Sequence, residues 1–300
     1  MKIAVFGSTG FIGKNIITNF DSKYTLQEIS LRSNNWRDNL TSVDVYFNAI
    51  GKAHDHDSKA TDADYEFANV LIVKEVFLEF LKSDATLFIH ISSIAAVEEF
   101  ESVEPILENF ICRPQSIYGK SKREAEEWLI KQTLPSNKKL IIIRPPMIHG
   151  KGDKGTLGLL YKFISKGLPY PLQAYDNKRS FISVDNLIFF LEKIIDKHNM
   201  IPSGIYHVSD NETVSLTEII TIIEQITGRR GLRLKLPKFI IEGVARIGDI
   251  FPLPLNTKRL RKMTSNLLVS NEKICKALDI IELPLSAEEG LKRTISSLQK

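Results

Sequence analysis

The sequence predicts an α/β fold, with a doubly wound parallel sheet joined to a smaller, mostly helical C-terminal lobe. Short apolar runs alternate with segments of helical periodicity over the first half of the chain. This alternation is typical of strand–helix–strand units in a parallel sheet. A glycine-rich turn follows the first apolar run directly. Beyond Gly150 helical segments prevail, and two of them begin with capping boxes. We therefore expect a strand-rich unit at residues 1–150 and a helical unit after it.

The composition limits the classes of protein to which the chain can belong. Its 300 residues are 43% hydrophobic and 25% charged, as in a soluble globular protein. No apolar run approaches the roughly 20 residues of a membrane span, and the N-terminus lacks the pattern of a signal peptide. Cys112 and Cys275 form no ligand or redox motif, which favours a reducing, cytoplasmic setting. The net charge of +4 suits an anionic small molecule and does not require nucleic acid.

The first strand, expected from Lys2 to Phe6, leads into a glycine-rich turn and then a helix. The turn has the sequence Gly7-Ser8-Thr9-Gly10-Phe11-Ile12-Gly13. Strand, glycine-rich turn and helix in this order are the context of a Rossmann dinucleotide-binding site. The first glycine allows the tight turn, the second lets the backbone approach a pyrophosphate, and the third lets the helix pack close to the strand. The spacing is Gly-x2-Gly-x2-Gly, whereas the common fingerprint is Gly-x-Gly-x2-Gly. We predict that the turn binds a dinucleotide at the helix N-terminus.

The second strand, expected from Leu26 to Leu31, indicates which cofactor is bound. An acidic residue at the tip of this strand accepts a hydrogen bond from the ribose 2′-OH of NAD, whereas an arginine accommodates the 2′-phosphate of NADP. The tip has no acid, and Arg32 follows it. A guanidinium pairs well with a phosphate, so Arg32 slightly favours NADP(H) over NAD(H). The alternative is a solvated arginine on a loop.

The third and fourth strands, expected at Val43–Ile50 and Thr86–Ile91, end in residues suited to ligands. The third ends in Ala49-Ile50-Gly51, where small side chains would let a cofactor lie against the backbone. The fourth is followed by Ser92 and Ser93. Ligands bind at the carboxyl ends of strands in open α/β sheets, and a hydroxyl there can donate to a substrate oxygen. Serines are also common turn residues, so both interpretations stay open.

Three further features lie between or within these strands. Ala63–Lys82 is expected to form a helix whose wide apolar coverage suits burial in the core or against a second subunit. His54-Asp55-His56-Asp57 precedes it. These residues are adjacent and charged and have no identified distant partner ligands, so we predict a solvated loop and no metal site. His90 lies within the fourth strand, and we expect it to be a core residue.

Tyr118 and Lys122 lie four positions apart in Ser116-Ile117-Tyr118-Gly119-Lys120-Ser121-Lys122, which is expected to begin a helix running to about Thr133. That spacing places both side chains on one face of the helix. A tyrosine hydroxyl has an ordinary pKa of about 10. A neighbouring cation favours the phenolate and lowers that pKa toward neutral pH. The pair is therefore a candidate proton-transfer device, although the spacing also fits two exposed residues on a solvated face.

The rest of the chain completes the first unit and forms the second. Residues 181–209 are expected to return to the first unit, so that 151–180 and 210–300 form the second. The expected elements are strands at Lys139–Arg144 (ending at Pro145-Pro146), Phe181–Val184 and Gly204–Ser209, and helices at Thr156–Lys166 and from a cap at Asp185 to about Lys197.

The second unit carries helix signals and a strongly basic character. Ser215-Leu216-Thr217-Glu218 and Ser286-Ala287-Glu288-Glu289 are capping boxes that open helices. Lys238–Phe251 is an apolar helix that we expect to pack within the lobe. Contact with a membrane or a lipid-linked substrate is the alternative. The basic runs at 229–233 and 258–262 are interleaved with few aromatic residues. We expect a solvated face there, in part a phosphate-binding lip, and no nucleic-acid surface.

In combination, these motifs resemble those of the extended short-chain dehydrogenase/reductases. The shared features are the glycine turn at residue 7, a serine after the fourth strand and Tyr118-x3-Lys122, in that order. Later segments resemble the nucleotide-sugar (UDP-sugar) 4-epimerase and 4-ketoreductase branch of the NAD-dependent epimerase/dehydratase family. These segments are Arg144-Pro145-Pro146-Met147-Ile148-His149-Gly150, Gly167-Leu168-Pro169, Asn177-Lys178-Arg179-Ser180-Phe181-Ile182-Ser183-Val184-Asp185-Asn186-Leu187 and Gly290-Leu291-Lys292-Arg293-Thr294. The resemblance covers nearly the whole chain.

The resemblance implies roles for individual catalytic and substrate-binding residues. Tyr118 would be the general acid/base, and Ser93 would hydrogen-bond the C4 oxygen of the sugar. Lys122 would bind the nicotinamide ribose and lower the pKa of the tyrosine. Arg179 lies where the family has an arginine for the sugar-nucleotide pyrophosphate, and Arg261 is a candidate for a second phosphate contact.

The resemblance also extends the set of residues expected at the cofactor. Asn69 resembles a family asparagine near the active site. Together with the glycine turn, Arg32 and Lys122, the set comprises Ala49, Ile50, Gly51, Asn69 and Pro145.

Ile94 and Ala95 restrict the reaction that the resemblance implies. The dehydratases of the family carry an acidic pair directly after the hydroxyl residue, whereas neither of these side chains can move a proton. We therefore exclude a 4,6-dehydratase. The resemblance implies an NAD(P)-dependent oxidoreductase acting at C4 of a UDP-hexose or UDP-N-acetylhexosamine in surface polysaccharide biosynthesis. Either a 4-epimerase or a 4-ketoreductase fits.

Two further expectations concern assembly and a rival function. The resemblance implies a homodimer formed through the helices at 63–82 and 118–133. The rival hypothesis is a non-catalytic NADP(H)-binding sensor that regulates a partner. Such proteins keep the glycine turn but can lose the Tyr/Lys pair, so the presence of Ser93, Tyr118 and Lys122 together argues against it.

Overall fold

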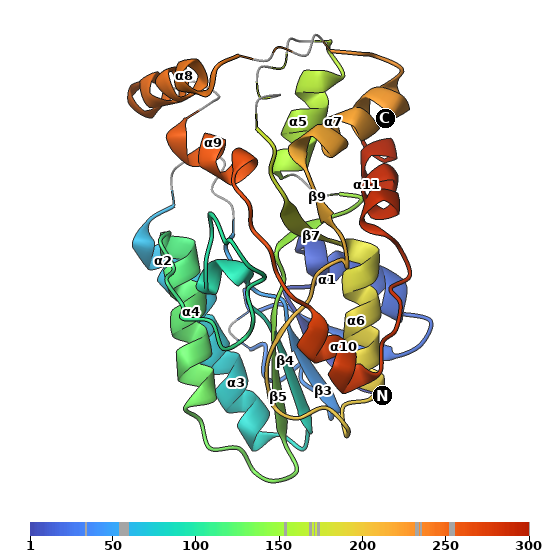
Figure 1. The fold of residues 1–300 in the computed structure, drawn as a ribbon. Helices are drawn as coiled ribbons and strands as arrows, with labels where there is room; N and C mark the ends of the chain where they lie inside the picture. Colours follow the sequence, from blue (N-terminus) through green and yellow to red (C-terminus); the bar gives the residue numbers. More distant parts are fainter. Residues whose placement is uncertain are drawn as a thin grey trace.

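A parallel sheet forms the centre of the molecule (Figure 1). A computed structural model describes residues 1–33, 35–53, 60–152, 155–167, 170, 172, 175–231, 234, 236–251 and 256–299. Within these ranges the sheet has six parallel strands in the order β2-β1-β3-β4-β5-β8. They are β1 (Lys2–Phe6), β2 (Thr25–Ile29), β3 (Val45–Asn48), β4 (Leu87–Ile91), β5 (Lys139–Arg144) and β8 (Gly204–His207). The strand order reverses between β1 and β3, where open α/β sheets bind ligands. The predicted α/β fold class is confirmed.

Helices cover both faces of the sheet because its strands are apolar on both sides. Ile3 and Val5 belong to a core shared with α1 and α6, whereas Ala4 and Phe6 belong to a core shared with α3 and α4. This alternation follows from the two-residue period of a strand. The four helices are α1 (Phe11–Phe20), α3 (Ile72–Lys82), α4 (Ile117–Ile130) and α6 (Val184–Asp196).

The helix expected at Ala63–Lys82 is interrupted near its start. It consists of α2 (Asp62–Glu66), a π-helical turn η1 (Phe67–Leu71) and α3. Asn69 lies in η1 and is fully buried. Single π-helical turns inside α-helices are frequent at functional sites. The segment His54-Asp55-His56-Asp57, which precedes this helix, lies outside the described residues.

A second sheet, which the sequence did not predict, joins the main sheet to the lobe. Its strands are β6 (Met147–His149), β7 (Arg179–Ser183) and β9 (Thr213–Val214), with β6 parallel and β9 antiparallel to β7. β7 begins two residues before the predicted strand because Arg179 and Ser180 pair with β9.

The prediction that Asp185 caps the next helix is wrong. The cap is Ser183, whose hydroxyl accepts a hydrogen bond from the backbone N–H of Asn186 at 3.2 Å.

The lobe packs its helices around a core of its own. These helices are α5 (Thr156–Ile164), α7 (Leu216–Thr227), α8 (Lys238–Ile250), α9 (Thr257–Thr264) and α11 (Ala287–Ser296). Both predicted capping boxes are confirmed, at Ser215 and Ser286. α10 (Glu272–Leu278) differs, because its Ile274 and Leu278 pack in the core of the main sheet. The division of the chain into two units with the boundaries given above stays an interpretation.

α8 packs within the lobe, as predicted, but only along one side. Its buried side is formed by one large residue, Ile241, and two small ones, Ala245 and Gly248. Most of its large apolar side chains are exposed. Within the described part of the chain, no helix combines the length and the apolar character needed to cross a membrane.

The packing of α1 on the first strand leads to a stability prediction. A Cβ atom at Gly13 would lie 2.2 Å from the carbonyl oxygen of Gly7, so Gly13→Ala forces the helix away from the turn. We expect a loss of about 3 kcal/mol in the free energy of unfolding, measured by urea denaturation. Gly243→Ala is the control, since nothing lies within 4 Å of its Cβ position inside α8. It is expected to stabilise by about 1 kcal/mol. Equal effects of the two substitutions would contradict the prediction.

Candidate active site

The glycine turn has the conformation that a dinucleotide site requires. Gly7 has a φ of +83°, in the left-handed region that favours glycine. It lies against the end of β3, where a Cβ atom would come 3.0 Å from the carbonyl carbon of Ala49. Gly10 is the N-terminal cap of α1 and offers no side-chain acceptor, and the first turn of the helix contains no acidic residue. The free N–H groups and the positive end of the helix dipole therefore suit an anionic pyrophosphate.

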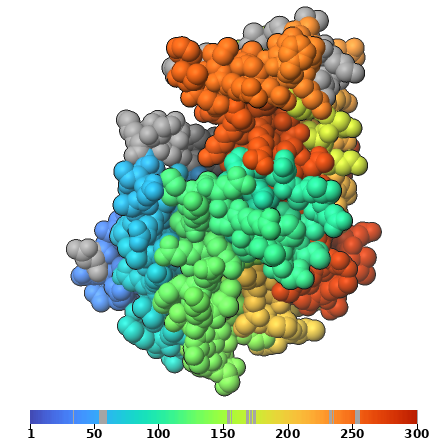
Figure 2. Space-filling view, turned by 60° about the vertical axis from the view of Figure 1, so that its left-hand side comes forward, coloured from blue at the N-terminus to red at the C-terminus, as the bar shows by residue number. Residues whose placement is uncertain are grey.

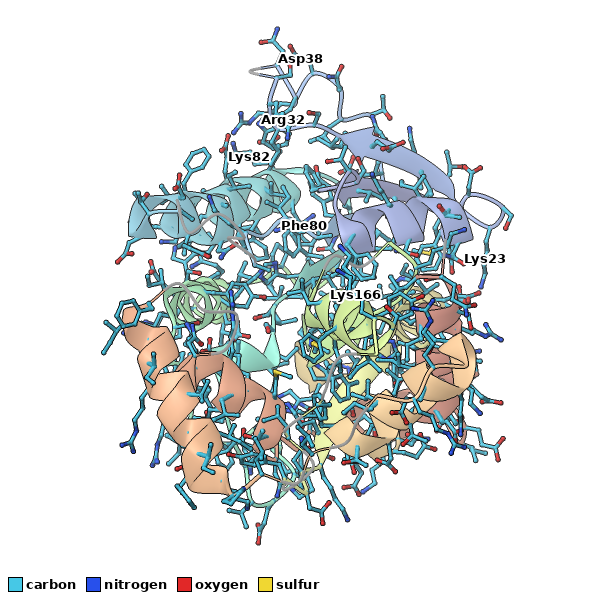
Figure 3. All side chains as sticks on the ribbon, turned by 90° about the horizontal axis from the view of Figure 1, so that it is seen from above. Lys23, Arg32, Asp38, Phe80, Lys82 and Lys166 are labelled. Atoms are coloured by element: carbon cyan, nitrogen blue, oxygen red, sulfur yellow. The ribbon has the colours of Figure 1, made fainter. Side chains whose placement is uncertain are left out.

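A shallow pocket of about 320 Å³ lies beside this turn. It is lined by Ser8, Thr9, Lys14, Ile17, Thr18 and Glu28. Arg32 is exposed and lies on the loop beyond β2, the edge strand of the sheet; Figure 3 labels it on the same side of the molecule as Asp38. It is not among the residues that line the pocket. The residues present fit a nicotinamide dinucleotide, and they do not distinguish NADP(H) from NAD(H).

Lys122 lies at the ends of β3 and β4. Its side chain is 3% exposed, and Nζ donates to the carbonyl oxygens of Ile91 at 2.9 Å and Ile50 at 3.5 Å. Gly51 lies against the ammonium group. Burial lowers the pKa of Lys122 from its usual value to about 8, and the neighbouring Glu126 carboxylate acts in the opposite direction. The lysine is thus held where α4 meets the residues after β3 that were predicted to contact the cofactor.

Asn69 connects the loop after β3 to α4. Its amide nitrogen donates to the hydroxyl of Ser121 at 2.9 Å and to the carbonyl oxygen of Lys52 at 3.1 Å. Its amide oxygen accepts from the backbone N–H of Lys52 at 2.7 Å. Because these bonds involve both ends of the amide, Asn69 holds the loop in position beside Lys122. Direct contact of this residue with a cofactor stays a prediction.

Tyr118 and Ser93 face each other across a close contact between α4 and the turn η2 (Ile94–Ala96). The helix approaches so closely that a Cβ atom at Gly119 would lie 2.4 Å from the carbonyl oxygen of Ala95. The hydroxyl of Ser93 lies near that of Tyr118 and acts to lower the pKa of the phenol. The hydroxyl of Ser93 also accepts from the backbone N–H of Ala95 at 3.2 Å. The structure therefore brings together the three residues predicted to be catalytic.

Burial raises the pKa of Tyr118 to about 12, although the neighbouring Ser93 hydroxyl acts in the opposite direction. This differs from the sequence expectation that Lys122 lowers the pKa of the tyrosine. Lys122 directs its ammonium group toward the backbone carbonyls of Ile50 and Ile91, and burial of the phenol sets the direction of the shift. Tyr118 is therefore a neutral phenol at pH 7, in the form that donates a proton.

A buried charge network, which the sequence analysis missed, distinguishes Ser92 from Ser93. Ser92 donates to Glu126 at 2.6 Å, and Arg144 donates to both oxygens of Glu126, at 2.8 and 2.7 Å. These three residues are at most 3% exposed. The hydroxyl of Ser92 is therefore used in this buried network, and the hydroxyl of Ser93 is the one left for a substrate. In the sequence, Glu126 lies four positions after Lys122 and therefore on the same, buried face of α4. This spacing is the signal from which the buried carboxylate could be predicted.

Basic side chains gather around Phe100, above the carboxyl ends of the strands. Arg179 donates from Nη1 to the carbonyl oxygen of Phe100 at 3.0 Å and to that of Ser265 at 3.1 Å. Burial lowers its pKa to about 10. The guanidinium of Arg261 lies 4.7 Å from the ring centre of Phe100, and Lys262 Nζ lies 5.6 Å from it. The basic run 258–262 thus contributes two cations to one cluster with Arg179, including Lys262, which the sequence analysis did not select.

Two histidines of the first unit, His90 and His149, are core residues. His90 is fully buried, as predicted, and burial lowers its pKa well below the usual value. His149 is also fully buried. Its Nδ1 lies 2.9 Å from the Thr294 hydroxyl, and burial lowers its pKa to about 4. Neither imidazole is exposed to a substrate.

Pro145 contributes to the site through its backbone. Its carbonyl oxygen accepts a hydrogen bond from the N–H of Ile94 at 2.9 Å.

Comparison with known proteins identifies the family. The model of the NAD-dependent epimerase/dehydratase family matches residues 3–209. The chain is 30% identical over 242 residues to a UDP-glucose 4-epimerase of Vibrio cholerae, which covers 73% of this chain and 74% of that relative. It is 24% identical over 255 residues to an N-acetyl-alpha-D-glucosaminyl-diphospho-ditrans,octacis-undecaprenol 4-epimerase of Escherichia coli O157:H7, covering 79% and 75%.

Solved structures support the same fold. A UDP-glucuronic acid 4-epimerase from Bacillus cereus in complex with NAD superimposes with a TM-score of 0.78 and 16% identity. The match covers 99% of this chain and 96% of that one. At this identity the comparison shows the fold, which agrees with the six-stranded sheet and its flanking helices.

The buried ammonium of Lys122 leads to a pH-dependence prediction. Its pKa is about 8 in the folded protein, whereas the ordinary pKa of a lysine, expected for the unfolded chain, is 10.5. Between these values the unfolded chain binds more protons, so the free energy of unfolding rises with pH. Relative to Lys122→Met, the wild type is expected to gain about 3 kcal/mol across this pH range. Urea denaturation from the lower to the higher pKa measures the difference. A constant difference would contradict the prediction, and Lys120→Met, on the exposed side of α4, is the control.

Proposed function

This chain belongs to the NAD-dependent epimerase/dehydratase family, and we propose that it is a nicotinamide-dependent oxidoreductase acting at C4 of a nucleotide-activated sugar. The observation that carries this proposal is the close approach of α4 to the turn η2, which brings Tyr118 and Ser93 together beside the buried Lys122. All three lie at the carboxyl edge of the sheet, next to the glycine turn that fits a dinucleotide.

The chemistry follows from the positions of the hydroxyl groups. A bound nicotinamide would supply the hydride exchanged with C4. The phenol of Tyr118 gives a proton to O4 when a 4-keto sugar is reduced, and takes it back when the alcohol is oxidised. Ser93 donates a hydrogen bond to O4 and stabilises the charge that develops there. Lys122, held at the ends of β3 and β4, would bind the nicotinamide ribose.

Dehydration does not fit these residues. Ile94 and Ala95 follow Ser93 in the turn η2 and carry only hydrocarbon side chains. Loss of water from a sugar needs a second proton-transferring group at this place, as noted above for the dehydratases. The nearby carboxyl group of Glu99 accepts a hydrogen bond from Ser116. The reaction is thus confined to oxidation and reduction at one carbon.

The basic cluster supports a diphosphate-linked sugar as substrate. Arg179 and Arg261 were expected to contact phosphate, and Lys262 adds a third cation around Phe100. Guanidinium groups bind phosphates through charge-assisted hydrogen bonds. We propose a UDP-hexose or UDP-N-acetylhexosamine that feeds surface polysaccharide synthesis in the cytoplasm. The similarity to a UDP-glucose 4-epimerase and to an epimerase of an undecaprenol-linked sugar supports this class.

Epimerase and 4-ketoreductase are separated by one assay. The enzyme is incubated with UDP-N-acetylglucosamine and no added cofactor, and inversion at C4 is followed by NMR. Inversion identifies an epimerase and excludes the reductase. Consumption of NADPH with a UDP-4-keto sugar, without inversion in the first assay, identifies the reductase. The neutral phenol of Tyr118 suits the reductive direction. Absence of both activities would refute the proposal.

Tyr118→Phe tests the assigned acid/base. Removing the hydroxyl leaves no proton donor for O4, so kcat is expected to fall by about 10²–10⁴-fold while the fold is retained. Steady-state kinetics with the active substrate measure this change. Tyr161→Phe, on α5 of the lobe, is the matched control and is expected to keep full activity. Unchanged turnover in Tyr118→Phe would favour the rival hypothesis of a non-catalytic NADP(H) sensor.

Arg32→Ala tests the proposed preference for NADP(H). If the guanidinium contacts the 2′-phosphate, the Kd for NADPH rises about tenfold and the Kd for NADH stays the same. Fluorescence titration of both cofactors measures the two constants. Arg230→Ala, an exposed arginine of the lobe, is the control. Equal Kd values for both cofactors in the wild type would contradict the preference.

We also propose a homodimer formed through α3 and α4. Leu71 and Leu78 are exposed, are seven positions apart and therefore lie on one side of the helix. Ile130 adds an exposed apolar side chain at the end of α4. Sedimentation velocity is expected to show a dimer for the wild type and a monomer for Leu78→Asp. A monomeric wild type would contradict this assembly.

A further inference from the structure

α8 is amphipathic, and its apolar side is exposed. Ile241 and Ala245 face the core of the lobe, where they join Leu260 of α9. The other side of the helix presents large apolar groups with exposed fractions between 41% and 79%. They are Phe239, Ile240, Val244, Ile247 and Ile250, followed by Phe251, and we call them the α8 face. Contiguous exposed apolar side chains of this kind mark interaction surfaces.

The α8 face lies at one end of the molecule. Figure 1 shows α8 above α9, at the end of the lobe that is farthest from the main sheet. In the space-filling view of Figure 2 the segment crosses the top of the molecule and projects outward, with no described element above it. A flat partner can therefore approach the α8 face without contact with the main sheet.

The α8 face belongs to a basic segment of the chain. Residues 229–262 contain ten lysines and arginines and two acidic residues. The segment therefore carries more positive charge than the whole chain, whose net charge is +4, and the rest of the chain is net negative. Arg246 and Lys238 on α8 and Lys258 on α9 are exposed, as are the acidic residues Glu242 and Asp249 on α8. The excess of positive charge therefore comes from the parts of the segment that flank the helix.

We propose that the α8 face docks on the surface of an anionic phospholipid bilayer. An amphipathic helix with bulky apolar side chains on one face and lysines and arginines beside them binds in the plane of the membrane interface. Anionic head groups attract such basic segments. With 13 residues, α8 is too short to span a bilayer and lies on it.

The charge also argues against a second copy of the chain as the occupant. A two-fold pairing through α8 would bring the same positively charged segment of both copies together. Repulsion between the two segments would oppose that contact, whereas an anionic lipid surface neutralises them. The surface is separate from the helices proposed above for the dimer.

Docking through α8 would orient the rest of the lobe. α9 packs directly beneath α8, and its Arg261 and Lys262 turn toward Phe100 on the opposite side. The candidate active site would then lie one helix layer from the membrane, open to the aqueous side. The docking surface does not depend on the proposed function, since no catalytic residue belongs to it.

Co-sedimentation with lipid vesicles tests the proposal. The full chain is mixed with vesicles of phosphatidylcholine, alone or with phosphatidylglycerol, at low and at high sodium chloride. We expect the protein to pellet with the anionic vesicles, and less of it at high salt. A protein that stays in the supernatant with both vesicle types would overturn the proposal. Binding that is equal for both types and independent of salt would overturn it as well.

Variants connect the binding to α8. Ile247→Asp combined with Ile250→Asp is expected to lower the vesicle-bound fraction about tenfold without a change in Tm. Ile281→Asp is the matched control, because Ile281 is 93% exposed in the connection between α10 and α11. Equal loss in the control, or no loss in the α8 variant, would overturn the assignment. Sedimentation velocity without lipid tests whether a second copy of the chain binds the α8 face instead. A wild-type dimer that the α8 variant abolishes would identify the second copy as the occupant and overturn the proposal.

Discussion

The geometry of the candidate site depends on the buried ion pair between Glu126 and Arg144. Arg144 ends β5, Glu126 lies in α4, and Ser92, directly after β4, donates to the same carboxylate. The pair therefore ties α4 to the ends of two adjacent strands. Tyr118 and Lys122 lie eight and four positions before Glu126, on the same face of the helix. Removing one partner of such a pair leaves a buried charge and is costly, so the position of α4 relative to Ser93 is well determined.

The loop after η2 connects this part of the site to the lobe. The carbonyl oxygen of Phe100 accepts from Arg179 of β7 and from the Ser265 hydroxyl that follows α9. The ring of the same residue lies beneath the guanidinium of Arg261. Residues that would exchange protons with the sugar and residues that would bind its phosphates are thus joined through one residue. A displacement of α9 is transmitted directly to the loop that begins at Ser93.

The sequence predicted the features that depend on neighbouring residues. The glycine turn, the capping boxes at Ser215 and Ser286 and the alternation of strands and helices are local patterns, and the structure contains them. The features that it did not predict depend on residues far apart in the chain. β7 begins at Arg179 because of its pairing with β9. Glu126 pairs with Arg144 across 18 positions. The packing of α8 depends on how little of its surface the lobe covers, which no local periodicity reports.

The π-helical turn η1 makes the orientation of α2 relative to α3 depend on the number of residues between them. Each residue advances an α-helix by about 100°, so the extra residue of a π turn rotates α2 relative to α3 by that angle. The two segments are therefore out of phase with each other. Within the turn, Asn69 points inward to Ser121, whereas Phe67 and Leu71, two positions before and after it, are exposed. The number of residues between the cap at Thr61 and the start of α3 is thus a part of the site, as specific as the identity of any side chain in it.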